Sequence, residues 1–189
     1  AVIANYQLGA DLQQLEKWSE ARKYYEAVVK AKSTDQNKDY QKLATQQFEQ
    51  IDQYLFGVRI QNYIDKQDWK NVSKELKPLL QKQGAEAPVD WVILWRQAEI
   101  GQKNWKEALA TWDLQRKVDP ESAETAEALI QQGSLKEQIG DNSGALVSYR
   151  KVLENAADLT LEAQAVGRVS SILQQQRNYT ELVEFYSQR

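Results

Sequence analysis

The chain has 189 residues, 24 basic and 27 acidic side chains, and a hydrophobic fraction of 42%. It contains no Cys and no His, which excludes disulfides, thiol nucleophiles, Cys-ligated zinc and imidazole acid–base chemistry. The net charge of −3 and the pI near 5.2 argue against nucleic-acid binding, which needs a basic face. No apolar run approaches the roughly 20 residues of a membrane span.

The first 34 residues predict a helical hairpin. Leu8, Leu12 and Leu15 are spaced i, i+4 and i+7, which places them on one face of a helix. A short polar turn follows, and Trp18 and Tyr25 then lie on one face of a second helix. Because the turn is short, the two helices must run antiparallel.

The stretch 35–66 is the irregular part of the pattern. Apolar residues from Tyr40 to Val58 keep a period of about 3.6 residues, and Gly57 interrupts them. Two interpretations remain open: one long bent helix, or an extra helix that runs into the first helix of the next hairpin. The alternation typical of a strand is absent here.

Later boundaries are indicated by Pro and Gly. Asp119 and Pro120 resemble a cap followed by a proline at the first helical position, and Pro88 starts the preceding hairpin in a similar way. Gly84 is expected to end the helix before it. Pro78 falls inside a predicted helix and therefore predicts a kink or an early end, because it removes a backbone hydrogen bond.

One phrase recurs along the chain: an aromatic residue, a small residue three positions later, and a large apolar residue seven positions later. Its copies begin at Trp18, Trp69, Trp105 and Tyr179, and a weaker copy without the aromatic residue begins at Asn142. Taken in chain order, the five copies lie 51, 36, 37 and 37 residues apart. Three near-equal steps and one long step predict a regular array with an insertion of about half a repeat. A single hairpin cannot bury its own apolar face, so each must stack on the next.

The phrase is similar to the tetratricopeptide repeat. The residues that carry the resemblance are Leu8, Gly9, Ala21, Tyr25, Trp95, Ala98, Trp105, Ala108, Trp112, Pro120, Gly133, Ala145 and Tyr149. Val72 and Leu182 stand where the family has Ala. Arg96 occupies a position that is usually small, which implies looser packing of its helix.

The resemblance implies an all-α fold, a right-handed superhelical solenoid of antiparallel helix pairs. The whole chain, 1–189, would then be a single array. Its repeats would cover 2–34, 54–85, 89–121, 123–158 and 160–189, with an extra helical insertion over 35–53. The family also implies a concave groove lined by the first helix of each pair, and binding of peptides or proteins through it.

The groove predicted in this way is neutral and rich in amides, which can both donate to and accept from a peptide backbone. Its predicted residues are Tyr6, Gln7, Gln13, Gln14, Tyr54, Gln61, Asp65, Ile93, Gln97, Gln131, Ser134, Gln138, Gln164, Arg168, Ser171 and Gln175. Tyr6, Tyr54 and Ile93 are the expected anchors. Tyr6 and Ala10 stand where the carboxylate-binding subgroup of the family has Lys and Asn, so that function does not carry over.

No catalytic, metal-binding or cofactor-binding site is predicted. Glu121, Glu124 and Glu127 have helical spacing, but a solvated helix start explains them better than acid–base catalysis. The segment 140–144 suggests a phosphate or calcium loop in composition, yet it falls at an expected inter-helix turn.

The leading hypothesis is a non-catalytic scaffold or adaptor module of a larger protein, which binds another protein or a peptide and does not insert into a membrane. The alternative is a structural spacer or self-assembling element that stacks through its end helices, where Leu182, Val183, Phe185 and Tyr186 would expose apolar surface. The lack of Cys and the Gln and Trp content favour a bacterial periplasm or cell envelope over the cytoplasm.

Overall fold

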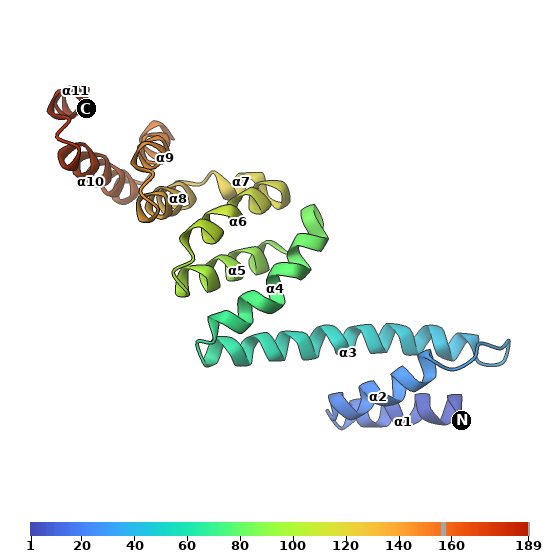
Figure 1. The fold of residues 1–189 in the computed structure, drawn as a ribbon. Helices are drawn as coiled ribbons and strands as arrows, with labels where there is room; N and C mark the ends of the chain where they lie inside the picture. The colour runs from blue at the N-terminus through green and yellow to red at the C-terminus, as the bar shows by residue number, and fades with distance from the viewer. Residues whose placement is uncertain (156–157, 189) are drawn as a thin grey trace. The chain divides into compact units, whose positions relative to one another are not determined.

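The computed structural model describes residues 1–155 and 158–188, and over these residues it contains eleven α-helices, one short 3-10 helix and no strand (Figure 1). The all-α prediction is therefore confirmed for the described part of the chain. The helices pack mainly on their neighbours in sequence. They form two compact units, Ala1–Gln67 and Asp68–Arg189. No helix in the described ranges is both long enough and apolar enough for a membrane span.

The first unit consists of α1 (Val2–Gln14), α2 (Trp18–Val29) and α3 (Lys38–Asp65). Helix α2 packs on both of the others. Its residues Tyr25 and Val28 are buried together with Ala44 and Ile51 of α3. The irregular stretch is thus one continuous helix of 28 residues, and Gly57 lies within it.

The second unit begins with α4 (Trp69–Gln83), the 3-10 helix η1 (Gly84–Glu86), α5 (Val89–Gly101), α6 (Trp105–Val118) and α7 (Pro120–Ala123). Helix α4 ends at Gln83 and is capped by Gly84, as predicted. An early end at Pro78 is wrong, because the helix continues to Gln83. Leu76 and Leu80 are both fully buried, and their burial on either side of Pro78 stabilises the helix across the lost hydrogen bond.

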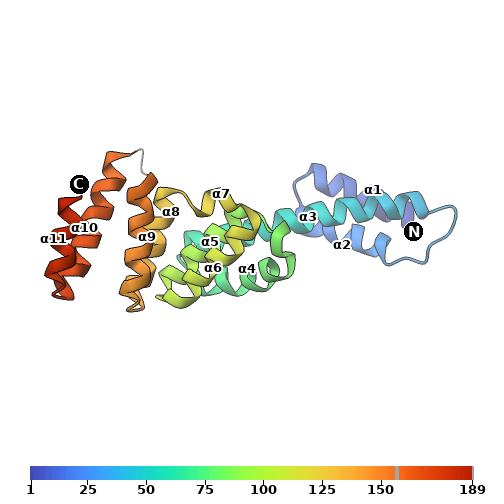
Figure 2. The ribbon, with the colours of Figure 1, turned by 90° about the horizontal axis from the view of Figure 1, so that it is seen from above.

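The unit continues with α8 (Ala126–Gln138), α9 (Asn142–Asn155), α10 (Leu159–Gln175) and α11 (Tyr179–Ser187). Figure 2 shows these helices side by side in chain order. Helix α9 packs on both α8 and α10, and one apolar cluster joins the three helices. Its buried members are Leu129, Ala145, Leu146, Tyr149, Val152, Ala165, Val169, Ile172 and Leu173.

The recurrent phrase begins a helix at every copy. Trp18, Trp69, Trp105, Asn142 and Tyr179 are each the first residue of a helix, which confirms the predicted starts. The residue two positions earlier has a positive φ at each copy. These residues are Glu16 (57°), Gln67 (53°), Lys103 (61°), Gly140 (80°) and Arg177 (55°). The same left-handed backbone position therefore precedes all five helices, although only one of these residues is a glycine.

Candidate functional site

The second unit contains a cavity of about 550 Å³ between α8 and α10, which we name the α8–α10 cavity. It is lined by Ile130, Gln131, Ser134, Ala163, Gln164, Gly167, Arg168 and Ser171. Five of these, Gln131, Ser134, Gln164, Arg168 and Ser171, belong to the groove predicted from the sequence. The structure thus brings together, from two helices, predicted residues that are 30 or more positions apart in the chain.

The position of the cavity follows from the packing of the helices. Leu129 of α8 and Ala165, Val169 and Ile172 of α10 turn toward α9 and are buried. Residues on the other faces of α8 and α10 are consequently left to line the space between the two helices. Gly133 allows α9 to pack closely on α8, because a Cβ at this position would lie 2.6 Å from Cε1 of Tyr149.

Small side chains form one stripe on the α10 side of the cavity. Ala163, Gly167 and Ser171 are spaced four residues apart, which places them along one face of the helix. A Cβ added at Gly167 would meet no atom within 4 Å, so the space above this residue is open. A chain segment can therefore approach the α10 backbone closely at this point.

Arg168 is the one charged residue among the described residues that line the cavity. Its side chain is 56% exposed, and Nη1 lies 3.8 Å from Oε2 of Glu137. The hydroxyl of Tyr149 donates a hydrogen bond to Oε1 of the same carboxylate. Burial and this hydrogen bond raise the pKa of Tyr149 well above its usual value. Glu137 thus links Arg168 to the core, while the guanidinium remains accessible to a ligand.

Four other groove residues predicted in the second unit lie elsewhere, and one of them, Gln175, is exposed at the end of α10. Ile93 is half-buried and Gln97 is exposed, both on α5. Gln138 lines a different cavity, described below. None of these four residues lines the α8–α10 cavity.

In the first unit, several predicted groove residues have internal partners. The ring of Tyr6 packs edge-on against Tyr25, with centroids 5.7 Å apart. Gln13 donates to Oε1 of Gln47 over 3.0 Å and accepts from the hydroxyl of Tyr25 over 2.9 Å. These contacts hold the Tyr6 ring and the Gln13 amide within the packing of the unit.

The remaining predicted residues of this unit are more exposed. Tyr54 is 49% exposed, and its ring lies 4.8 Å from that of Trp18. Gln61 donates to Asp65 over 2.8 Å on the surface of α3. Gln7 is exposed on α1.

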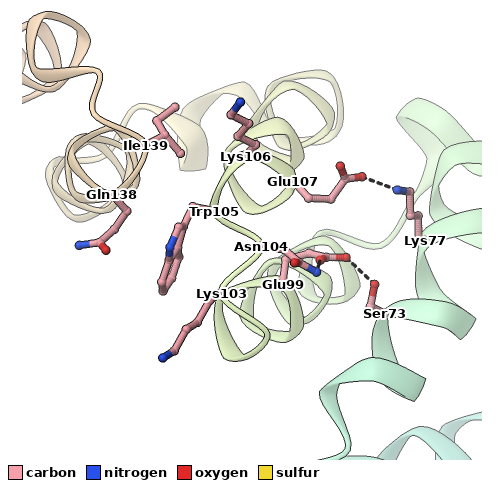
Figure 3. Close-up of a pocket in the computed structure, with 10 residues that line it drawn as sticks. All are labelled: Ser73, Lys77, Glu99, Lys103, Asn104, Trp105, Lys106, Glu107, Gln138 and Ile139. Carbon is pink, nitrogen blue, oxygen red and sulfur yellow. Dashed lines mark hydrogen bonds and ion pairs between the residues drawn. The ribbon is translucent and has the colours of Figure 1, made fainter.

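Sequence reasoning missed a second cavity of about 670 Å³, which is shown in Figure 3. It is lined by Ser73, Lys77, Glu99, Lys103, Asn104, Trp105, Lys106, Glu107, Gln138 and Ile139. We name it the Trp105 cavity. Its residues come from α4, from the last turn of α5 and the loop that follows it, from the start of α6 and from the end of α8. The three lysines were the available signal, but nothing in their spacing places them together.

Three further observations concern charged residues of the second unit and the possibility of a metal site. Glu124 is exposed and forms ion pairs with Arg116 and Lys151, at 3.3 and 3.4 Å. Arg96, expected to loosen the packing of its helix, is instead 3% exposed and stacked on Trp112. Among the described residues, no group of three or more acidic side chains is arranged to hold a metal ion.

The chain matches no protein-family model, and its comparison with curated proteins finds no relative.

Proposed function

We propose that the chain is a non-catalytic protein- or peptide-binding module, a tetratricopeptide-like solenoid that holds a segment of its partner in the α8–α10 cavity. The observation that carries this proposal is the convergence of Gln131, Ser134, Gln164, Arg168 and Ser171 on one cavity. A volume of about 550 Å³ lies within the range of ligand-binding sites.

The lining suits an extended polypeptide. The amides of Gln131 and Gln164 can donate to and accept from a peptide backbone. The open space above Gly167 admits that backbone, and the half-buried Ile130 supplies apolar contact. Arg168 adds one positive charge, which favours a partner with an Asp or Glu side chain at this point.

A peptide library displayed on phage tests the proposal. We expect the intact chain to enrich a consensus sequence, and a Gly167→Leu variant, whose side chain would project into the open space above α10, to enrich none. Gly57→Leu is the matched control, because a Cβ at this helical glycine also meets no atom within 4 Å. Equal enrichment by the Gly167→Leu variant would remove the cavity as the binding site.

A second candidate function is self-association through the end helices. Tyr179, Val183 and Tyr186 are spaced i, i+4 and i+7 on α11 and are 60%, 67% and 53% exposed. Leu8 and Leu15, near the other end of the chain, are 44% and 67% exposed. A second copy of the chain could cover both faces, because exposed apolar stripes of this kind favour association.

Sedimentation velocity over a hundredfold range of concentration tests self-association. We expect the mass to rise with concentration and the Val183→Glu variant to remain a monomer, because a charge would then lie in the buried interface. Gln174→Glu is the control, since this residue is exposed on α10. A monomeric intact chain at every concentration would exclude this function.

A further inference from the structure

The Trp105 cavity has properties that the proposed peptide-binding function does not use. It lies within the second unit, and it shares no lining residue with the α8–α10 cavity. Its volume of about 670 Å³ is sufficient for a small organic molecule. Figure 3 shows its side chains around the indole of Trp105.

The two acidic residues of the cavity already have partners. Glu99 is 2% exposed and accepts hydrogen bonds from the Ser73 hydroxyl and from Nδ2 of Asn104, the latter over 2.9 Å. Its carboxylate also accepts from Nε1 of Trp95 over 2.8 Å. Glu107 forms an ion pair with Lys77 at 2.5 Å, as Figure 3 shows. These contacts satisfy both carboxylates without a ligand.

Two of the three lysines in the cavity have no such partner. Lys103 and Lys106 are exposed, and neither ammonium forms a hydrogen bond or ion pair with a described residue. Figure 3 shows their side chains on opposite sides of Trp105. Three lysines against two carboxylates leave the lining with a charge of 3 − 2 = +1, in a chain whose net charge is −3. A lysine ammonium binds phosphate or carboxylate as a point charge.

Trp105 adds a flat surface to this positive charge. The residue is half-buried, and its indole lies between Lys103 and the pair Gln138 and Ile139 in Figure 3. An aromatic ring binds another planar ring by offset stacking or edge contact. We propose that the Trp105 cavity binds a small anion that carries a planar ring, with the ring against Trp105 and the anionic group paired with one of the two lysines that flank it, Lys103 or Lys106.

Isothermal titration calorimetry and NMR on the full chain test this proposal. The probes are ADP, benzoate and inorganic phosphate, which separate a phosphorylated ring, a carboxylated ring and an anion without a ring. We expect ADP or benzoate to bind and to shift the indole N–H signal of Trp105, which a Trp105→Phe variant assigns. Removal of both lysines in the Lys103→Gln/Lys106→Gln variant should weaken binding by about tenfold or more, because charge-assisted contacts are lost.

The control is Lys82→Gln/Lys117→Gln, which removes the same charge from two exposed lysines of α4 and α6 outside the cavity. Unchanged binding by the control and loss in the cavity variant support the site. Three outcomes overturn it: no binding of either ring compound at millimolar concentration, equal weakening in the control, or phosphate binding as tightly as the ring compounds. Circular dichroism of each variant establishes that all are folded.

Discussion

The guanidinium of Arg96 stacks on the indole of Trp112, with Cζ 3.2 Å from the ring centroid, in the interior of the second unit. Nε of Arg96 donates to Oγ1 of Thr111 over 2.9 Å, and a second nitrogen donates to Oε1 of Gln115. Both acceptors are neutral. The buried cation is therefore stabilised by a π face and two dipoles, and burial lowers its pKa to about 9.

We expect replacement of Arg96 by an apolar side chain of similar length to increase stability. Arg96→Met removes the desolvation cost of the charge and should raise the free energy of unfolding at pH 7 by about 1–2 kcal/mol. Lys117→Met, an exposed change on α6, is the control. Urea unfolding measures the difference, and a loss of stability in Arg96→Met would show that the stacked cation contributes favourably.

The same residue predicts a pH dependence. Burial lowers the pKa of Arg96 to about 9 in the folded chain, well below its ordinary value in the unfolded chain, so between the two values the unfolded chain holds the proton more tightly. The unfavourable contribution of Arg96 is therefore complete below pH 9 and is relieved as the pH rises through this value. The advantage of Arg96→Met should shrink between pH 8 and pH 10, and a constant difference would contradict the assignment.

The contact of Gly133 with Tyr149 predicts a large effect of one methyl group. Gly133→Ala should lower the free energy of unfolding by about 2 kcal/mol, because the fully buried Tyr149 ring must shift to admit it. Gly167→Ala on α10 places its methyl group in open space. It should instead raise the free energy of unfolding by about 0.5–1 kcal/mol, because alanine is the better residue inside a helix. Thermal unfolding of both variants checks the prediction, which fails if the two changes have the same sign.

The hydrogen bonds of Glu99 predict the cost of losing a buried acceptor. Glu99→Ala leaves the donors of Ser73, Trp95 and Asn104 without a partner and should lower the stability by about 3 kcal/mol. Glu99→Gln keeps one acceptor oxygen, so its loss of stability should be about half that of Glu99→Ala. Glu154→Ala, an exposed change on α9, should alter the stability by less than about 0.5 kcal/mol.

Arg168 predicts the charge preference of the proposed peptide site. Selection from a peptide library should enrich Asp or Glu with the intact chain, and Lys or Arg with Arg168→Glu, because this residue is the charged group in the cavity lining. Arg177→Glu is the control, because Arg177 is exposed in the turn that follows α10. This change should leave the charge preference unaltered. An unaltered preference in Arg168→Glu would show that the charge does not contact the peptide.

Part of the α8–α10 cavity could be predicted from the sequence because it depends on spacing within each helix. Residues 131 and 134, and residues 164, 168 and 171, are three or four positions apart and share a helix face. The small residues Ala163 and Gly167 were not predicted. They line the cavity because no neighbouring helix covers them, and the positions of neighbouring helices cannot be read from spacing within one helix. In the first unit the same spacing selected Tyr6 and Gln13, but their partners on neighbouring helices hold them in the packing.

The sequence by itself determined the all-α class, the helix starts at Trp18, Trp69 and Trp105, and the end of α4 before Gly84, because caps, turns and apolar periodicity act over a few residues. Only the tertiary structure decided that Arg96 is buried and that Lys77 and Lys103 meet Gln138 at one cavity. These juxtapositions depend on how helices pack against one another, and side-chain contacts far apart in the chain fix that packing.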